Sequence, residues 1–331
     1  MQKVQTQQLL PSASWFRYLL LAAWLATGAV AIAIAFSSQQ DLPFLKNILA
    51  PLRSHVTADK ALYSPLAYFG LLSVVYILER RMPVRDQAFF STSFCQDALW
   101  YPGSMLFRAL FLGWYVALLN AVYQQYFSFL TLDSIANWHP AARFILAVLI
   151  TDFSRWLSHL IRHKVPLFWT FHAVHHSQRN LNLFTDARVH PVDRMFSSTL
   201  RFIPLMMLGN DVVVILVWAI FETIYPKFYH ANIRLNLGLL RYILVTPQSH
   251  RVHHASEAPY RDKNFGFTFS IWDRLFGTHY KDDNDYPVSG VHDHGYQPEN
   301  RTTPQALAGT FLHLLIYPFL QVLRINKSPE N

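Results

Sequence analysis

The sequence has little of two things that most secreted and soluble proteins use freely, cysteine and charge. Cys95 is the only cysteine among 331 residues, which excludes an intrachain disulfide scaffold and a cysteine-based zinc cluster. Charged side chains make up 15% of the chain, where an ordinary soluble domain carries roughly 25%. Hydrophobic residues make up 52%, which excludes an intrinsically disordered chain. The remaining classes are a large soluble domain and an integral membrane protein.

Long uncharged runs favour the membrane protein. Residues 18–36, 61–78 and 109–132 contain no Asp, Glu, Lys or Arg. A helix that crosses the hydrocarbon core needs about 20 apolar residues, so each run is a predicted span. A fourth predicted span, 141–158, contains Asp152, and an ionisable residue inside a span suggests a functional role.

Basic residues orient the predicted spans. Three arginines within 80–85 follow the second span, and the loop 133–142 between the third and fourth spans has no Lys or Arg. The positive-inside rule then predicts that the N-terminus, the loop 79–104 and everything after Ser158 lie on the cytoplasmic side. The basic residues on the cytoplasmic side explain the net charge of +8. The sequence has no basic patch interleaved with aromatic residues, so it gives no indication of nucleic-acid binding.

Two later apolar stretches leave the number of spans open. The stretch 202–221 is interrupted by Gly–Asn–Asp at 209–211, which we interpret as a turn between two membrane-embedded or interfacial helices. The stretch 306–323 contains a proline, and either lies in the interface or spans the membrane.

The histidines carry the strongest chemical signal. His159 and His163 are four residues apart, which on a helix places both imidazoles on one face. The spacing His–x–x–His–His then occurs twice, again with three imidazoles on one helix face, and two single histidines lie between these motifs. The ten histidines are His159, His163, His172, His175, His176, His190, His230, His250, His253 and His254.

Ten patterned imidazoles indicate bound metal ions. Neutral imidazole is the commonest ligand of borderline transition metals, and at roughly five ligands per ion ten imidazoles would suit two ions. Several buried histidines beside a membrane would cost too much free energy unless each had a partner, which a metal supplies. Lone histidines such as His55, His139 and His313 are interpreted as ordinary core or surface side chains.

The order HxxxH, HxxHH, HxxHH behind hydrophobic spans resembles the fatty acid hydroxylase / sterol desaturase superfamily. The resemblance covers about 141–280 and departs from the family pattern at Leu160 and Ala255. Residues around the motifs extend it: Asp152, Phe153 and Trp156 before the first motif, Pro166, Phe168, Trp169 and Phe171 before the second, Thr246 and Pro247 before the third, and 264–266 and 271–277 after it.

The resemblance implies an O₂-dependent di-iron enzyme that hydroxylates a fatty acyl, sterol or other lipid. Together with the spans it predicts an all-α integral membrane protein, with about four transmembrane helices and a helical, histidine-rich catalytic cap on the cytoplasmic side. The expected parts are N-terminal transmembrane helices and loops in 1–140, the catalytic domain in 141–280, and a C-terminal interfacial or membrane helix with its tail in 281–331.

The resemblance also assigns the metal ligands. The eight histidines of the three motifs are expected to bind two iron ions, with zinc an alternative in purified material because imidazole binds both. His230 is expected as a ligand, and His190 as a ligand or near neighbour, whereas the role of His279 is left open.

Carboxylates are expected to support the ligands, because a metal-bound imidazole usually donates its second N–H to a carboxylate or carbonyl. Asp152 is favoured, since it shares a helix stripe with His159 and His163. The other candidates are Asp186, Asp193, Asp262 and Asp273. For each of them an ordinary solvated or capping role is an equal alternative.

The lipid is expected to reach the metals through an apolar tunnel near 204–221, with 272–274 covering its mouth. The sequence has no Gly-rich nucleotide motif, so a separate ferredoxin, cytochrome b5 or reductase is expected to supply electrons. A bacterial inner membrane is favoured over the endoplasmic reticulum. The alternatives are a lipid desaturase with the same metals and, remotely, a membrane metal transporter, whose ligands would lie near the bilayer midplane. A purely structural membrane protein would not need patterned imidazoles.

Overall fold

The computed structural model describes residues 58–88, 90–209, 223–296 and 302–325. The predicted span 18–36 lies outside these ranges. The chain divides into two units, Met1–Leu71 and Leu72–Asn331, and helix α3 (Ala58–Arg81) contains the predicted span 61–78 and runs from the first unit into the second. The described residues contain isolated β-bridges but no strand, which confirms the prediction of an all-α protein.

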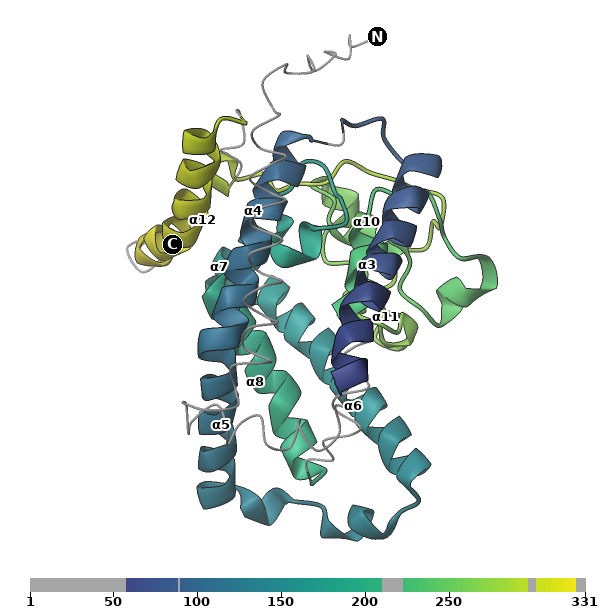
Figure 1. Ribbon diagram of the computed structural model, residues 1–331, viewed down its shortest axis with the longest axis vertical. Helices are drawn as coiled ribbons and strands as arrows, with labels where there is room; N and C mark the ends of the chain where they lie inside the picture. The colour runs from purple at the N-terminus through teal and green to yellow at the C-terminus, as the bar shows by residue number, and fades with distance from the viewer. Residues whose placement is uncertain (1–57, 89, 210–222, 297–301, 326–331) are drawn as a thin grey trace. The chain divides into compact units, whose positions relative to one another are not determined.

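The second unit is built from helices of very different length (Figure 1). In chain order they are α4 (Thr92–Phe107), the π-helix η1 (Arg108–Leu112), α5 (Gly113–Tyr126), α6 (Pro140–Lys164), α7 (Pro166–His176), α8 (Pro191–Met207), α10 (Pro247–His253), α11 (Ile271–Leu275) and α12 (Pro304–Ile325). Short 3₁₀ turns join them at Ser128–Leu130, Asp133–Asn137, Thr185–Ala187, Gly238–Tyr242, Ala258–Tyr260 and His294–Tyr296.

Proline marks the start of most of these helices. Helices α6, α7, α8, α10 and α12 all begin at a proline, which is favoured there because its fixed φ suits a helix and its missing N–H has no partner in the first turn. The preceding residue often caps the helix, as Thr246 does by accepting a hydrogen bond from the Ser249 backbone N–H. The helix starts are therefore fixed by local sequence.

Three helical segments are long and apolar enough to cross a membrane: Thr92–Tyr126, which joins α4, η1 and α5, then Pro140–Lys164 and Pro304–Arg324. They contain or overlap the predicted spans 109–132 and 141–158 and the apolar stretch 306–323, for which an interfacial position was the alternative. The predicted span 109–132 was placed too late, because the helix begins at Thr92 and ends at Tyr126. Helix α8 ends at Met207, before the expected turn at Gly209, and 210–222 lie outside the described residues.

The end of the unit away from the histidines is a helix bundle. Helices α6 and α8 pack through Ala147 and Leu205, with Phe144 and Phe202 beside them. Helix α5 meets α8 where the Tyr115 and Thr199 hydroxyls lie 2.5 Å apart. Many outward side chains on α5 and the first half of α6 are large and apolar, as expected for a surface that faces lipid.

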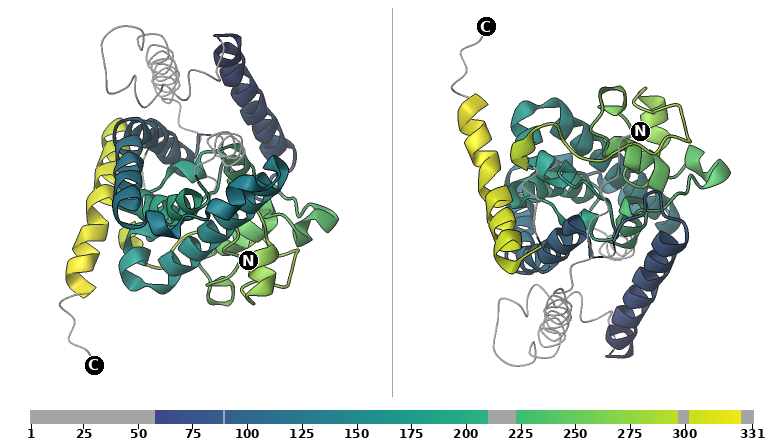
Figure 2. Two further views of the ribbon diagram at one scale, coloured as in Figure 1. Left: turned by 90° about the horizontal axis from the view of Figure 1, so that it is seen from below. Right: turned by 90° about the horizontal axis from the view of Figure 1, so that it is seen from above.

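Shorter helices and loops gather at the other end, around the C-terminal part of α6 (Figure 1). A hydrophobic core there joins Trp100 of α4, Val174 of α7 and Leu314 of α12. Figure 2 shows α12 along the outer side of this region. Backbone bridges between Leu244 and Phe269 and between Ala255 and Ser289 tie the loops of this histidine-rich half together.

Candidate metal centre

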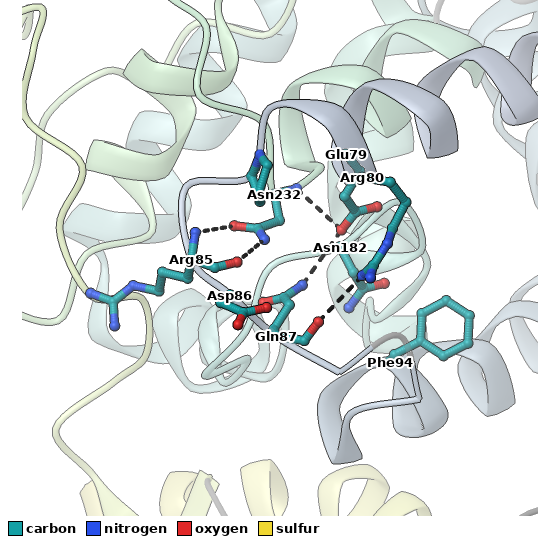
Figure 3. Close-up of a pocket in the computed structure, with 9 residues that line it drawn as sticks. Glu79, Arg80, Arg85, Asp86, Gln87, Phe94, Asn182 and Asn232 are labelled. Carbon is teal, nitrogen blue, oxygen red and sulfur yellow. Dashed lines mark hydrogen bonds between the residues drawn. The ribbon is translucent and has the colours of Figure 1, made fainter. Parts of the chain in front are cut away.

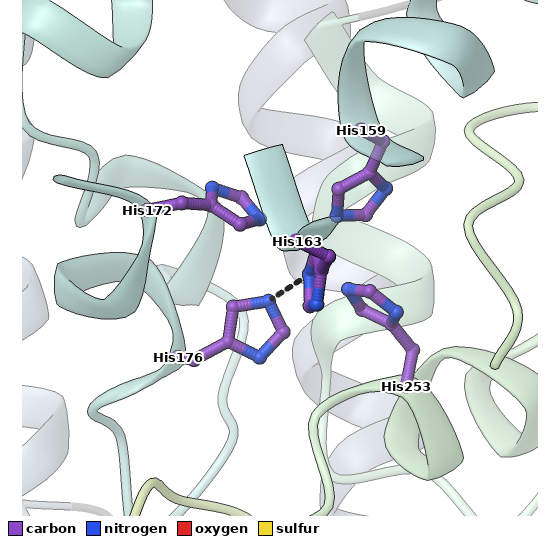
Figure 4. A group of neighbouring side chains, drawn as sticks. All are labelled: His159, His163, His172, His176 and His253. Atoms are coloured by element: carbon purple, nitrogen blue, oxygen red, sulfur yellow. Dashed lines mark hydrogen bonds between the residues drawn. The ribbon is translucent and has the colours of Figure 1, made fainter. Parts of the chain in front are cut away.

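Nine of the ten patterned histidines converge in two adjacent groups. The first group is His159, His163, His172, His176 and His253, and the second is His175, His230, His250 and His254. Within each group one nitrogen from every imidazole lies within 4.8 Å of the others. Figure 4 shows the first group with its five rings turned toward a common centre.

Helix geometry explains why the motifs split between the two groups. His172 and His176 are one turn apart on α7 and join the first group, whereas His175 between them joins the second. On α10, His253 joins the first group, and His250 and His254 join the second. Each His–x–x–His–His motif therefore contributes to both groups, and this brings the groups side by side.

Backbone carbonyls hold the outward nitrogens of several rings. The Nδ1 of His159 lies 2.9 Å from the Phe265 carbonyl oxygen, and the Nδ1 of His253 lies 2.9 Å from the Lys263 carbonyl oxygen. In the second group, the same contact joins His175 to Arg188 at 3.2 Å and His230 to Pro226 at 2.7 Å. A carbonyl only accepts, so each of these Nδ1 atoms carries the proton.

The tautomers fixed in this way leave lone pairs that point at one another. The Nε2 atoms of His175 and His230 are 3.2 Å apart, and neither has a proton to donate if Nδ1 is protonated in both neutral rings. In the first group, the buried Nε2 atoms of His159, His172 and His253 have no hydrogen-bond partner among the described residues. Converging lone pairs in a dry site fit a cation of imidazole-preferring type.

Burial keeps these imidazoles neutral. Desolvation lowers the pKa of His172 and of His230 to about 4 and the pKa of His253 to about 3. A buried ring of low pKa presents a free lone pair at neutral pH, which is the form that binds metal. The charge state of both groups is thus suited to metal ligation.

One of the expected carboxylates contacts a ligand candidate directly. Asp193 Oδ2 lies 3.1 Å from the Nδ1 of His172, and Asp193 also accepts from Arg162 Nη1 at 3.1 Å. The Arg162 guanidinium and the His172 contact hold the pKa of Asp193 well below its usual range against the effect of burial. Asp193 therefore stays ionised and orients the ring of His172.

The other expected carboxylates act at a distance from the imidazoles. Asp152, the favoured one, touches no histidine and instead accepts from the Thr268 and Phe269 backbone N–H groups and from Trp272 Nε1. Asp273 accepts from the backbone N–H of Phe265. Together they anchor to α6 the loop whose Phe265 carbonyl holds His159.

The remaining two candidates pair with lysines. Asp262 accepts from Lys164 at 2.5 Å and lies 3.8 Å from the Nδ1 of His163, with 41% of its side chain exposed. Asp186 pairs with Lys227 at 2.9 Å. Of the five expected carboxylates, only Asp193 lies within hydrogen-bond distance of a histidine among the described contacts.

A buried ion pair behind the second group was missed by the sequence analysis. Arg188 Nε donates to Asp97 at 2.6 Å, and both side chains are fully buried. The backbone carbonyl of Arg188 is the acceptor for His175, so Asp97 fixes the segment that orients a ligand candidate. The only signal in the sequence is that Asp97 is an isolated carboxylate within a largely apolar stretch, which forms α4.

The structure does not bring His190 into either group. His190 caps α8, where its Nδ1 accepts from the Val192 backbone N–H at 3.2 Å, and its Nε2 lies 3.1 Å from the Leu315 carbonyl oxygen. Both ring nitrogens are therefore engaged elsewhere. His279, whose role was left open, follows α11 and lies outside both groups as well.

Figure 3 shows a polar cavity of about 90 Å³, which is lined by residues of α3, of the segment that follows it, and of two loops. Asn232, which follows His230 by two residues, lines it and accepts from Arg251 Nη2 at 3.0 Å. Asn182, on its other side, donates to Asp97 at 2.7 Å. The cavity is polar and large enough for water, and Glu79 and Arg80 of α3 also line it.

Comparison with known families agrees with this geometry. The sequence model of the fatty acid hydroxylase family matches residues 144–278, a range that contains all nine clustered histidines. This region of the chain is similar to the fatty acid hydroxylase family. The predicted family resemblance is confirmed.

The names of several curated relatives of this chain state a lipid substrate. Ornithine lipid hydroxylase OlsE of Rhizobium tropici is 32% identical over 142 residues, which is 43% of each chain. Human alkylglycerol monooxygenase is 32% identical over 222 residues, 66% of this chain and 46% of the relative. Methylsterol monooxygenase 1 of Rattus norvegicus is 25% identical over 149 residues, 44% of this chain and 50% of the relative.

These matches leave much of each relative uncovered. The chain spans half or less of the length of each of these three relatives. No solved structure gives a significant match. The relatives are named as hydroxylases and monooxygenases, which are oxidoreductases.

Proposed function

We propose that this chain is an O₂-dependent lipid hydroxylase whose di-iron centre is held by the nine clustered histidines. The observation that carries the proposal is the convergence of nine imidazoles in two groups, five of which have their Nδ1 atoms tied outward to backbone carbonyls or to Asp193. Iron held there would supply the O₂ activation that removes hydrogen from an unactivated C–H bond. The names of the relatives support a lipid as substrate.

The ligands would divide unequally between two ions. The first group offers five imidazoles and the second offers four, so the two ions would differ in the number of positions left for exogenous ligands. The carbonyls of Phe265, Lys263 and Arg188 keep three of the rings oriented. Ligands held in this way need little reorganisation when oxidation state changes.

The surrounding side chains would keep bulk water from the reacting C–H bond. Val252 and Phe265 beside the histidines are fully buried, and Phe265 packs on His159, His163 and His253. We place the site on the cytoplasmic side of the membrane, as the basic residues after Ser158 indicate. A lipid would approach it from the bundle, and electrons would come from a separate donor protein.

Lipid analysis with labelled oxygen tests the proposal. Membranes that contain the wild-type chain, or a His175→Ala/His253→Ala variant as control, are incubated under ¹⁸O₂ with a cell extract that supplies electrons. We expect a lipid heavier by one oxygen-18 atom with the wild type only. A product that has lost two hydrogens without gaining oxygen would favour the desaturase, and identical lipid profiles for both chains would refute both oxidative functions.

A further inference from the structure

An exposed apolar surface lies outside the helix bundle, on two short elements of the histidine-rich half. The 3₁₀ turn Gly238–Tyr242 and the residue after it contribute Leu239, Leu240, Tyr242 and Ile243, and α11 with its C-cap contributes Ile271, Leu275 and Phe276. We call these seven residues the apolar shelf. Leu239 is 80% exposed and Leu275 is 66% exposed, values that are unusual for leucine side chains grouped together in water.

Hydrogen bonds join the two elements into a single surface. The backbone N–H of Ser270 donates to the Ile243 carbonyl oxygen at 2.8 Å, and the Ser270 hydroxyl donates to the Arg241 carbonyl oxygen at 2.8 Å. The Arg274 guanidinium lies 4.7 Å from the centre of the Tyr242 ring. Direct contacts therefore hold the two elements of the apolar shelf together as one surface.

Contacts with α6 fix where the apolar shelf lies along this membrane-spanning helix. Phe276 stacks on Trp156 with ring centres 4.6 Å apart, and Trp272 meets Phe153 at 5.1 Å. Phe153 and Trp156 belong to Pro140–Lys164, a helix long and apolar enough to cross a bilayer. On the same helix Leu149 and Leu157 are 40% and 36% exposed, so the shelf continues an outward apolar surface of α6.

The charges near the apolar shelf suit lipid headgroups. Two arginines, Arg241 and Arg274, lie among its residues, and the long apolar stem of arginine lets the guanidinium reach the headgroups while the stem stays in apolar surroundings. Arg241 also pairs with Asp283 at 2.6 Å, and Asp273 is buried and faces the protein interior. Among the described residues of the shelf's two elements, no carboxylate points outward to repel anionic lipid.

We propose that the apolar shelf inserts into the interfacial region of the bilayer, at the membrane face that carries the histidine-rich half, as a contact additional to the spanning helices. The occupant of this surface is lipid, because the shelf packs on a spanning helix at its histidine-bearing end and extends that helix's exposed apolar surface. Tyr242 lies at the edge of the shelf, where its ring and hydroxyl suit an interface that is apolar on one side and wet on the other.

The apolar shelf also connects the bilayer with the metal centre. Asp273 of α11 accepts from the Phe265 backbone N–H at 2.8 Å, and the Phe265 carbonyl holds the Nδ1 of His159 at 2.9 Å. Lipid that fixes α11 would thus also fix a residue that orients a ligand candidate. The insertion itself does not depend on the metal, so it can be tested on protein of any metal content.

Site-specific fluorescence tests the insertion. Because Cys95 is the only cysteine, a Cys95→Ala background permits single cysteines at Leu239 or Leu275, each labelled with nitrobenzoxadiazole in the full chain reconstituted in vesicles of phosphatidylcholine and phosphatidylglycerol. We expect spin-labelled lipid to quench both labels several-fold more than a control label at Glu257, and aqueous iodide to quench them several-fold less. Glu257 is exposed on a neighbouring polar turn.

Three outcomes would overturn the proposal. Labels at Leu239 and Leu275 that iodide reaches as readily as the Glu257 label would place the apolar shelf in water. Labels shielded from both quenchers would mean that protein covers the shelf, either another segment of this chain or a second copy. Equal lipid quenching at all three positions would mean that the label itself drives insertion. None of these outcomes bears on whether the chain hydroxylates a lipid.

Discussion

At the scale of single residues, protonation decides what the histidine groups can bind. A carbonyl behind His175 and another behind His230 fix the proton on Nδ1 in each ring, and the two Nε2 lone pairs then meet at 3.2 Å. Without a cation these lone pairs repel one another in a site that water does not solvate. This arrangement therefore costs folding free energy, which a bound cation would offset.

The two groups of ligands differ from His190 in a way that metal analysis can measure. His253→Ala removes an imidazole whose buried Nε2 faces the first group, and we expect the purified variant to contain less metal per chain than the wild type. His190→Ala removes a helix cap that faces neither group, and we expect its metal content to be unchanged. Elemental analysis by mass spectrometry checks both, and equal loss in the two variants would contradict the assignment.

Asp193 and Asp262 provide a second pair of matched variants. Asp193→Asn removes the charge that faces His172 and Arg162 in a buried site, and we expect metal affinity to fall by roughly 10- to 100-fold, as for other residues that orient ligands. Asp262→Asn acts on a half-exposed carboxylate 3.8 Å from His163, so its effect should be much smaller. Competition with a chromogenic chelator measures both affinities. A larger loss for Asp262→Asn would show that the wrong carboxylate was identified.

At the scale of elements, one loop connects α10, α11 and α6. Residues 264–270 contribute the carbonyl that holds His159, and Asp152 and Asp273 bind the backbone N–H groups of this loop from two sides. Gly266 of this loop is tightly packed. A Cβ at this position would come within 2.8 Å of the Phe269 carbonyl oxygen and of Val245 Cγ2.

Gly266→Ala should therefore destabilise the protein. Because backbone and a buried carboxylate leave no room for the methyl group, we expect a cost of about 1–3 kcal/mol and a lower metal content through displacement of the Phe265 carbonyl. Gly309→Ala on α12 is the control, since a Cβ there meets no heavy atom within 4 Å. Thermal unfolding in detergent compares the two, and unchanged stability of Gly266→Ala would mean that the loop can shift freely.

The sequence predicted which helices exist better than the residues at which they begin and end. Histidine spacing predicted helices at α6, α7 and α10, but it placed all three imidazoles of each His–x–x–His–His motif on one face, whereas the structure divides them between the two groups. The predicted end of the span at 132 was wrong because 127–130 are uncharged yet form a turn and a 3₁₀ helix, and uncharged composition does not distinguish such a turn from a continued helix. The preference for Asp152 over Asp193 followed from a shared helix stripe, whereas the contact with His172 comes from α8, a non-local pairing that spacing does not reveal.

At the scale of the whole molecule, buried polar pairs and the histidine groups occupy space that a soluble protein would fill with apolar side chains. Arg188, Arg251 and Lys227 are among the largest fully buried side chains of the described part. Each donates a hydrogen bond to an oxygen atom. Arg188 and Lys227 donate to carboxylates, and Arg251 donates to the side-chain oxygen of Asn232. Such a core depends on every partner being in place, because an unpaired buried charge is costly.

Metal removal should accordingly lower global stability. A ligand that binds only the folded state stabilises it by about 2.7 kcal/mol when its concentration is 100 times the dissociation constant, and the nine clustered imidazoles exist as groups only in the folded chain. We expect a strong chelator to lower the thermal midpoint, and added iron or zinc to restore it. A chelated sample with an unchanged midpoint would mean that the histidine groups are held by protein contacts alone.

The order of the ligands along the chain has a consequence for biosynthesis. Each group needs at least one histidine from 250–254, although the first imidazole is at His159. Translation therefore completes the spanning helices up to α6 nearly a hundred residues before either group can close. Loading of the proposed metal ions would then be a late event on a chain already inserted, and a ribosome stalled between α8 and α10 would expose an anchored chain whose histidine groups are incomplete.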